Sequence, residues 1–160
     1  MIKIQILSVQ PLKQSKPAFC GPAALRILTD YLGIKKSESA LARICKTTYK
    51  FGTHPWDLIN AIGKLGLKVE NGEWGGWGLL NDFINKKRLP VLVDWFKVDD
   101  GHYSVVCGLS KRFIWIADPA EAKIVRMPWR TFRRIWFDFE GDVLKKKKNL
   151  YLRWWLVAHK

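Results

Sequence analysis

Cysteines are scarce in this 160-residue sequence, and no apolar run approaches the length of a membrane-spanning helix. Three cysteines at irregular spacing make neither a disulfide framework nor a zinc motif, so no metal or other cofactor is expected. The first ten residues alternate between polar and apolar, without the pattern of a signal peptide. These absences predict a protein of the reducing cytoplasm that has free thiols and no transmembrane segment.

Acidic residues are also few, since 14 Asp and Glu face 28 Lys and Arg, a net charge of +14. Such an excess suits a nucleic acid, an anionic membrane surface, or an acidic substrate or partner. The run Lys145–Lys148 lies between two apolar segments, and a solvated hairpin turn explains it better than a binding patch. Because nothing resembles a nucleic-acid recognition motif, nucleic acid is the least expected partner. The composition leaves the oligomeric state open.

Apolar residues make up 48% of the chain, enough to bury the core of one domain over residues 1–160. Helical periodicity and capping signals predict five helices, over residues 20–32, 37–45, 55–65, 79–87 and 128–136. Alternating or β-branched segments predict strands over residues 1–8, 67–70, 91–97, 102–108, 113–117, 123–127 and 150–158. This order predicts an α+β fold, with a helical lobe (about 14–88) packed against an antiparallel sheet (about 89–160 plus strand 1–8). A cleft between the lobes would hold the active site.

Cys20 lies where the first helix is expected to begin. Pro17 ends any preceding helix, and Gly21 and Pro22 open the next one, because proline fits the first helical turn. The free N–H groups and the dipole of a helix N-terminus favour an anion, so a thiol there is more readily a thiolate. Cys20 is therefore a candidate nucleophile, although a free cysteine is more often a small buried core residue.

A nucleophilic cysteine needs a base, and the base needs a group that orients it. His102 opens a strand directly after Gly101, and Asp118 ends the next strand before Pro119. Adjacent antiparallel strands run in opposite directions, so the start of one lies near the end of the other. His102 and Asp118 are therefore expected to be neighbours, although a core histidine and an Asx turn are the simpler alternatives.

Gln14 precedes Cys20 in the loop that leads into the first helix. Acyl transfer develops negative charge on the carbonyl oxygen, and an amide N–H beside the Cys20 backbone N–H can stabilise it. Gln14 is the candidate for that oxyanion donor.

Gln14, Cys20, His102 and Asp118 occur in the order that resembles the papain-like cysteine peptidases, and more closely the bacteriocin-processing peptidase family. Members of that family carry a glutamine six positions before a Cys-Gly pair, then a Gly-His-Tyr/Phe stretch, then an Asp-Pro. The segment 89–93 also looks like the family's strand before the histidine. The resemblance covers about residues 14–118 and lacks papain's own sequence after the cysteine, since Pro22-Ala23 follow Gly21.

The resemblance implies a papain-like fold and cleavage of a peptide bond, and members of the family cut leader peptides after a Gly-Gly pair. The expected partner is thus a peptide or protein substrate. Two alternatives stay open: a catalytically silent basic binding module on the same fold, and another thiol acyl transfer such as transglutamination or amide transfer.

Three further residues are candidates for contact with the substrate. Trp74 and Trp77 flank a Gly-Gly pair in a loop, where their rings could narrow a cleft to small residues. Gly101 has no side chain, so another group can approach the strand closely beside His102.

Overall fold

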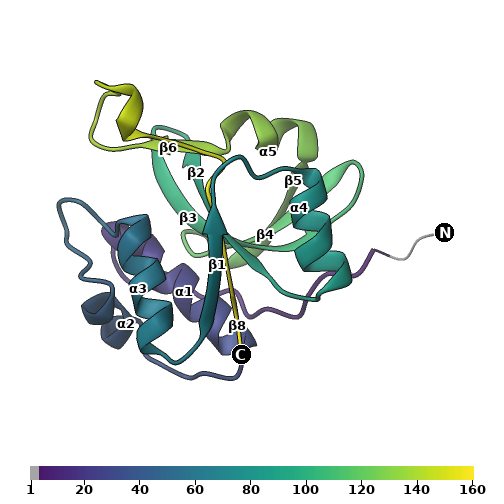
Figure 1. Ribbon diagram of the computed structural model, residues 1–160, viewed down its shortest axis with the longest axis horizontal. Helices are drawn as coiled ribbons and strands as arrows, with labels where there is room; N and C mark the ends of the chain where they lie inside the picture. Colours follow the sequence, from purple (N-terminus) through teal and green to yellow (C-terminus); the bar gives the residue numbers. More distant parts are fainter. Residues whose placement is uncertain (1–3) are drawn as a thin grey trace.

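The computed structural model describes residues 4–160, which form five α-helices and eight β-strands (Figure 1). The helices are α1 (Cys20–Tyr31), α2 (Glu38–Ile44), α3 (Pro55–Lys64), α4 (Trp77–Asn81) and α5 (Trp129–Ile135). The strands are β1 (Lys68–Gly72), β2 (Val91–Lys97), β3 (Asp100–Leu109), β4 (Phe113–Asp118), β5 (Lys123–Pro128), β6 (Phe137–Phe139), β7 (Leu150–Leu152) and β8 (Trp155–His159). This content confirms the predicted α+β class.

Local signals set the ends of the first three helices as predicted. α1 ends just before Gly33, which adopts a positive φ of 83°. Ser37 caps α2, because its side-chain oxygen accepts a hydrogen bond from the N–H of Ala40 at 3.2 Å. Pro55 occupies the first turn of α3, where its missing N–H leaves no bond unmade.

Six strands form one antiparallel sheet in the order β1-β8-β2-β3-β4-β5. The strand β3 lies between β2 and β4, and α1 packs against it. The register places His102 of β3 opposite Trp95 of β2, and both side chains are buried. The strand β1 joins this sheet at its edge, although it lies within the segment expected to form the helical lobe.

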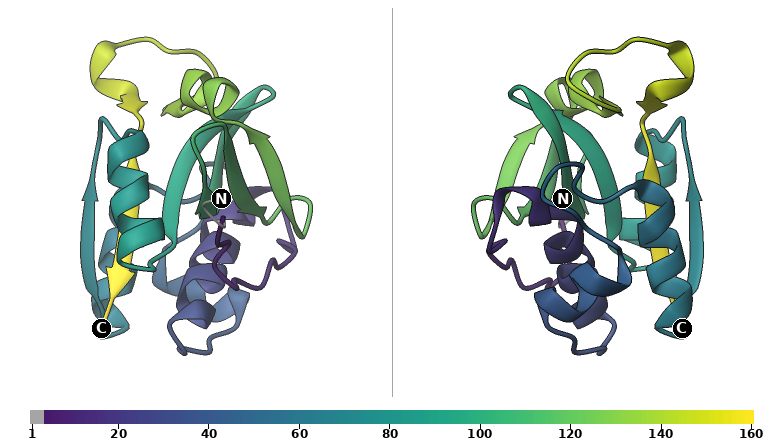
Figure 2. Two further views of the ribbon diagram at one scale, coloured as in Figure 1. Left: turned by 90° about the vertical axis from the view of Figure 1, so that its right-hand side faces the viewer. Right: turned by 90° about the vertical axis from the view of Figure 1, so that its left-hand side faces the viewer.

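The helices lie on different sides of this sheet. Figure 1 shows α1, α2 and α3 together on one side and α4 on the other. Both views in Figure 2 place α5 and the β6–β7 hairpin at one end of the molecule. Among the described residues, no helix is both long and apolar enough to cross a membrane.

The predictions for the two ends of the chain were wrong in part. Residues 4–8 form no strand, and only the N–H of Leu7 bonds to β3, at the Cys107 carbonyl (2.7 Å); residues 1–3 lie outside the described part. The expected strand 150–158 is two strands, because Arg153 has a positive φ of 50° that breaks the extended backbone. The first half, β7, pairs instead with β6 in a separate hairpin, and the sequence analysis did not predict β6.

The last part of the expected helix 79–87 is also irregular. A short α4 starts at Trp77 and continues as a π-helical turn over Asp82–Lys86. Its buried face, which includes Leu80, Phe83 and Ile84, is the face predicted from the sequence.

Candidate active site

His102 and Asp118 form a direct contact beside the start of α1. His102 Nε2 lies 2.6 Å from Asp118 Oδ1, and both side chains are buried. The antiparallel pairing of β3 with β4 produces this contact, because His102 is near the start of one strand and Asp118 ends the other. Since Nε2 faces the carboxylate, Nδ1 is the ring atom left for a second partner.

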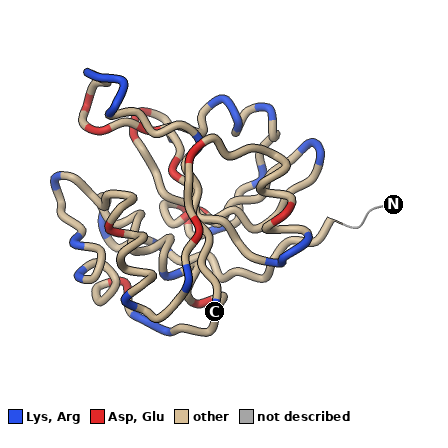
Figure 3. Tube along the Cα trace, in the orientation of Figure 1, with Lys and Arg blue, Asp and Glu red and all other residues tan. Residues whose placement is uncertain are grey.

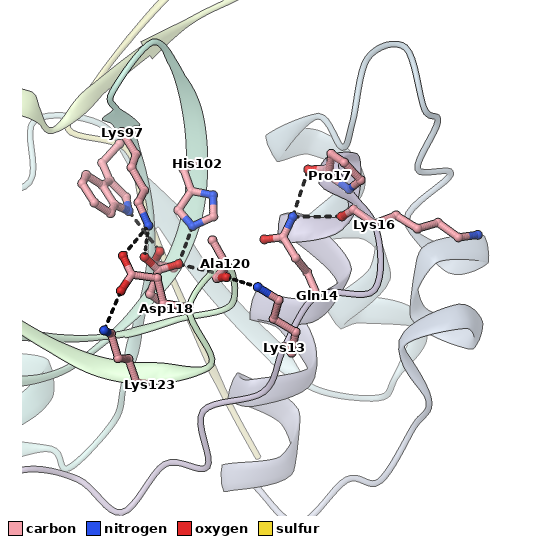
Figure 4. A network of polar contacts seen from close by, with 12 residues as sticks. Lys13, Gln14, Lys16, Pro17, Lys97, His102, Asp118, Ala120 and Lys123 are labelled. Carbon is pink, nitrogen blue, oxygen red and sulfur yellow. Dashed lines mark hydrogen bonds and ion pairs between the residues drawn. The ribbon is translucent and has the colours of Figure 1, made fainter.

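Asp118 is held by more than the histidine. Its Oδ2 pairs with Lys97 Nζ at 2.5 Å, and its Oδ1 also accepts the N–H of Ala120 at 2.8 Å (Figure 4). Burial by itself raises the pKa of this carboxyl, but the hydrogen bonds from His102 and Lys97 outweigh it and lower the pKa to about 2. Asp118 is therefore ionised at neutral pH and can orient the imidazole.

The sequence analysis did not identify Lys97. Its ammonium bridges Asp118 and Glu121, and these bonds raise its pKa even though burial acts in the opposite direction. Its position at the end of β2 is an ordinary one for a lysine, so only the pairing of β2 with β3 reveals its role.

Cys20 begins α1 as expected, and its thiol lies against the peptide that follows His102. The backbone N–H groups of Tyr103 and Gly21 both act on the sulfur and favour its thiolate. Burial is nevertheless the larger effect, and it raises the pKa of the Cys20 thiol to about 12, helped by the charges of Asp94 and Asp100. The expected thiolate at the helix N-terminus is thus wrong for the resting arrangement.

His102 does not offset the effect of burial on the pKa of the Cys20 thiol. Among the hydrogen bonds of residues 4–160, none joins the Cys20 sulfur to His102. The arrangement holds a neutral thiol near an imidazole whose Nδ1 is not bonded to Asp118. Transfer of the thiol proton to that nitrogen is the step that would generate a nucleophile.

Gln14 is held near the turn after Asp118 by its backbone. Its N–H donates to the carbonyl of Pro119 at 2.8 Å, so the loop before α1 is fastened to the turn after Asp118. Its side-chain Nε2 donates to the carbonyls of Lys16 and Pro17, both at 2.9 Å, whereas its Oε1 is buried without a partner (Figure 4). In this orientation both amide hydrogens are engaged, and Gln14 must turn before it can donate to an oxyanion.

The other three candidate residues have separate surroundings. Trp77 Nε1 donates a hydrogen bond to the Ser110 carbonyl at 2.9 Å. Ser110 directly follows the last residue of β3, whereas His102 is near the first residue of that strand. Trp74 is 72% exposed, and its backbone N–H bonds to Leu152. The group that approaches Gly101 is the carboxylate of Asp138, which a Cβ there would overlap.

Two carboxyl groups, one buried and one half-buried, lie on strands that contact β3. Asp94 of β2 is 2% exposed, its Oδ1 has no hydrogen-bond partner, and it shares a hydrogen bond with Asp138 of β6. Burial raises the pKa of Asp94 well above its ordinary value and that of Asp138 to about 6. An acidic residue inside the apolar run Val91–Lys97 is a signal that the sequence analysis could have used.

A pocket of about 470 Å³ lies between α3 and the β6–β7 hairpin. One wall includes His54, which caps α3, and Trp56 in the first turn of that helix. The other wall includes Tyr151 and Trp154. Thr53, next to His54, packs so closely on the start of α1 that a Cβ on Gly21 would lie 2.5 Å from its Oγ1. The lining includes neither Cys20 nor His102.

A protein family and several known proteins resemble this chain. The sequence profile described as the Peptidase C39 family matches residues 8–140. An uncharacterised protein of Methanothermobacter thermautotrophicus is 34% identical over 131 residues, which are 82% of this chain and 83% of the relative. A second uncharacterised protein, from Methanothermobacter marburgensis, is 32% identical over 132 residues, 82% of this chain and 84% of the relative.

Solved structures share the fold at low sequence identity. The peptidase domain of Streptococcus ComA, a bi-functional ABC transporter involved in quorum sensing, aligns with a TM-score of 0.71 and 23% identity, over 94% of this chain and 97% of the domain. A double glycine motif protease from an AMS/PCAT transporter, solved with its leader peptide, aligns with a TM-score of 0.72 and 18% identity, over 96% and 92%.

Proposed function

Since the chain belongs to the Peptidase C39 family and is a cysteine peptidase, we propose that Cys20 is its nucleophile and that His102, Asp118 and Gln14 complete the catalytic site. The observation that carries this assignment is the 2.6 Å contact between His102 Nε2 and Asp118 Oδ1, with the Cys20 thiol against the next peptide. A silent binding module has no need of a buried, ionised carboxylate that orients a histidine beside a cysteine.

The proposed reaction begins with transfer of the Cys20 proton to His102 Nδ1. The sulfur then attacks the scissile carbonyl, and the carbonyl oxygen becomes an oxyanion. The Cys20 backbone N–H and the Gln14 amide, once it has turned, stabilise that charge. As the C–N bond breaks, His102 returns the proton to the leaving amine, and an acyl-enzyme remains.

Water completes the cycle in a peptidase. His102 removes a proton from the water, the hydroxide attacks the thioester, and the thiolate leaves and recovers its proton. Asp118 stabilises the imidazolium that forms twice in each cycle. An amine in place of water would give acyl transfer instead, so the two outcomes share every residue and differ only in the acceptor.

We propose that the substrate is a peptide cut after a Gly-Gly pair, since one structural neighbour is described as a double glycine motif protease. The pocket of about 470 Å³ between α3 and the β6–β7 hairpin can receive the peptide segment before the cut, against the rings of Trp56 and Trp154. Glu73 and Glu140 also line this pocket, so it offers no positive charge to an acidic segment. The expected preference for acidic substrates has no support in this pocket.

A reducing compartment suits this chemistry, because Cys20, Cys45 and Cys107 are all free. We propose the cytoplasm as the place where the enzyme works, since a reduced thiol is then maintained.

Matched peptides test the proposed function. A peptide of about 25 residues with an internal Gly-Gly, and a copy with Ala-Ala, are incubated with the protein, and products are identified by mass spectrometry. We expect cleavage after Gly-Gly only, and none with Cys20→Ala, whose fold circular dichroism would verify. Cleavage of both peptides would contradict the Gly-Gly preference, and cleavage by Cys20→Ala would contradict the nucleophile. Hydroxylamine in the same assay reports acyl transfer as a hydroxamate product.

A further inference from the structure

Seven basic side chains gather at one end of the molecule, and the proposed reaction uses none of them. They are Lys145, Lys146, Lys147 and Lys148 in the β6–β7 loop and Arg130, Arg133 and Arg134 on α5, and all seven are exposed. Figures 1 and 2 place this loop and α5 at the same end, and Figure 3 shows Lys and Arg on both. We call this set the basic end.

These charges are not neutralised within the protein. Among the ion pairs of residues 4–160, none includes a member of the basic end. The acidic groups of the same loop are Asp142 and Glu140, and Glu140 already accepts hydrogen bonds from Tyr151 and Asn149. The basic end therefore presents a net positive charge to solvent, where it attracts an anionic surface.

Exposed apolar side chains accompany the lysines. Val143 is 65% exposed and Leu144 is 41% exposed, directly before Lys145 in the same loop. At the turn between β2 and β3, Val98 is 83% exposed. Phe96, two residues earlier, stacks on Phe137 and Phe139 of the β6–β7 hairpin. Water solvates none of these side chains well, so a partner with an apolar interior would cover them favourably.

A tryptophan lies at the base of the same hairpin. Trp74 is 72% exposed, and its N–H bonds to Leu152, the last residue of β7, at 2.8 Å. The next residue, Gly75, packs on Trp136, which directly follows α5. Tryptophan is favoured where an apolar layer meets a polar one, as at the headgroup level of a membrane.

From this combination we propose that the basic end docks on the surface of an anionic lipid membrane. The lysines and arginines meet the headgroups, and Val143, Leu144 and Trp74 enter the boundary with the acyl chains. A nucleic acid fits less well, because its phosphate backbone offers no apolar layer to cover the exposed Val143 and Leu144. Docking would be reversible, and it is independent of the proposed peptidase chemistry.

Vesicle sedimentation tests the proposal with the intact protein. The probe is a vesicle of phosphatidylcholine with about one third phosphatidylserine, compared with pure phosphatidylcholine, at low and at high salt. We expect binding to the anionic vesicle only, with a loss at high salt. Replacement of Lys145, Lys146, Lys147 and Lys148 by Gln should weaken binding by at least about a hundredfold, since each lysine contributes about fivefold.

A charge-matched control distinguishes binding at the basic end from attraction by the net charge of the whole protein. Gln in place of Lys36, Lys50, Lys64 and Lys68, all exposed and outside the basic end, removes the same charge and should weaken binding by less than about tenfold. The pair Val143→Ser and Leu144→Ser should weaken it by about tenfold with the charge intact. Equal losses in both lysine variants, or binding to double-stranded DNA but not to vesicles, would overturn the proposal. Unchanged peptide cleavage by every variant would show that the fold is intact.

Discussion

Asp118 holds two side chains at once: its Oδ1 lies 2.6 Å from His102 Nε2, and its Oδ2 forms an ion pair with Lys97 Nζ. The carboxylate is therefore shared between the lysine and the imidazole. This arrangement lowers the pKa of the Asp118 carboxyl to about 2 and fixes the ring orientation.

Asp118→Asn should lower kcat by roughly 10²-fold and leave KM within about twofold, because the amide holds the ring less well and does not stabilise the imidazolium. Peptide cleavage at several substrate concentrations measures both values. Glu121→Gln is the matched control, since it removes the other partner of Lys97 and leaves the bond to His102 in place. A wild-type rate in Asp118→Asn would remove this residue from the catalytic site.

Gln14→Ala should lower kcat by roughly 10²- to 10³-fold, as expected when one oxyanion donor is lost. In the resting arrangement both amide hydrogens bond to Lys16 and Pro17, so the cost of turning the side chain is part of the barrier. Gln14→Glu tests the direction of the dipole, because a carboxylate of similar shape should be at least as harmful as alanine. An active Gln14→Glu variant would contradict the assigned role.

Alkylation of Cys20 in the free protein should be slow at pH 6 and should accelerate with pH up to at least pH 9. The physical reason is that burial raises the pKa of this thiol to about 12, so the thiolate is rare near neutrality. Iodoacetamide labelling followed by peptide mapping gives the rate at each pH, with the buried Cys45 and Cys107 as internal references. Fast labelling at pH 5–6 that His102→Ala abolishes would instead show a preformed ion pair.

The wild-type free energy of unfolding should fall between about pH 4 and pH 7 because of Asp138. Burial raises its pKa from 3.8 to about 6 in the folded protein. The protonated form is favoured by folding, so this stabilisation is complete below about pH 4 and disappears as the pH passes 6. The corresponding loss is roughly 2–3 kcal/mol by pH 7.

Urea denaturation at pH 4, 5, 6 and 7 measures that loss. We expect Asp138→Asn to flatten the profile, whereas Asp142→Asn, in the exposed part of the same hairpin, keeps the wild-type slope. Equal slopes for wild type and Asp138→Asn would show that this carboxyl titrates normally. Burial likewise raises the pKa of the partner Asp94 well above its ordinary value.

Short-range signals in the sequence determined most of the secondary structure. Helix caps and prolines set the starts of α2 and α3, and the alternation around His102 predicted β3 and β4, which are paired as antiparallel neighbours. The proximity of His102 and Asp118 was predictable because it depends only on strand direction. The order of Gln14, Cys20, His102 and Asp118 also sufficed to indicate a relative of the papain-like peptidases.

Tertiary packing decided the features that depend on distant segments. Lys97 reaches Asp118 because β2 pairs with β3, and Asp138 reaches Asp94 because β6 contacts both strands. The residues next to Lys97 and Asp138 in the sequence do not indicate these contacts. The charge state of Cys20 was likewise misjudged from its helix position, because burial by the sheet outweighs the helix N-terminus. Local backbone preferences act over a few residues, whereas desolvation and ion pairing depend on everything that surrounds a side chain after folding.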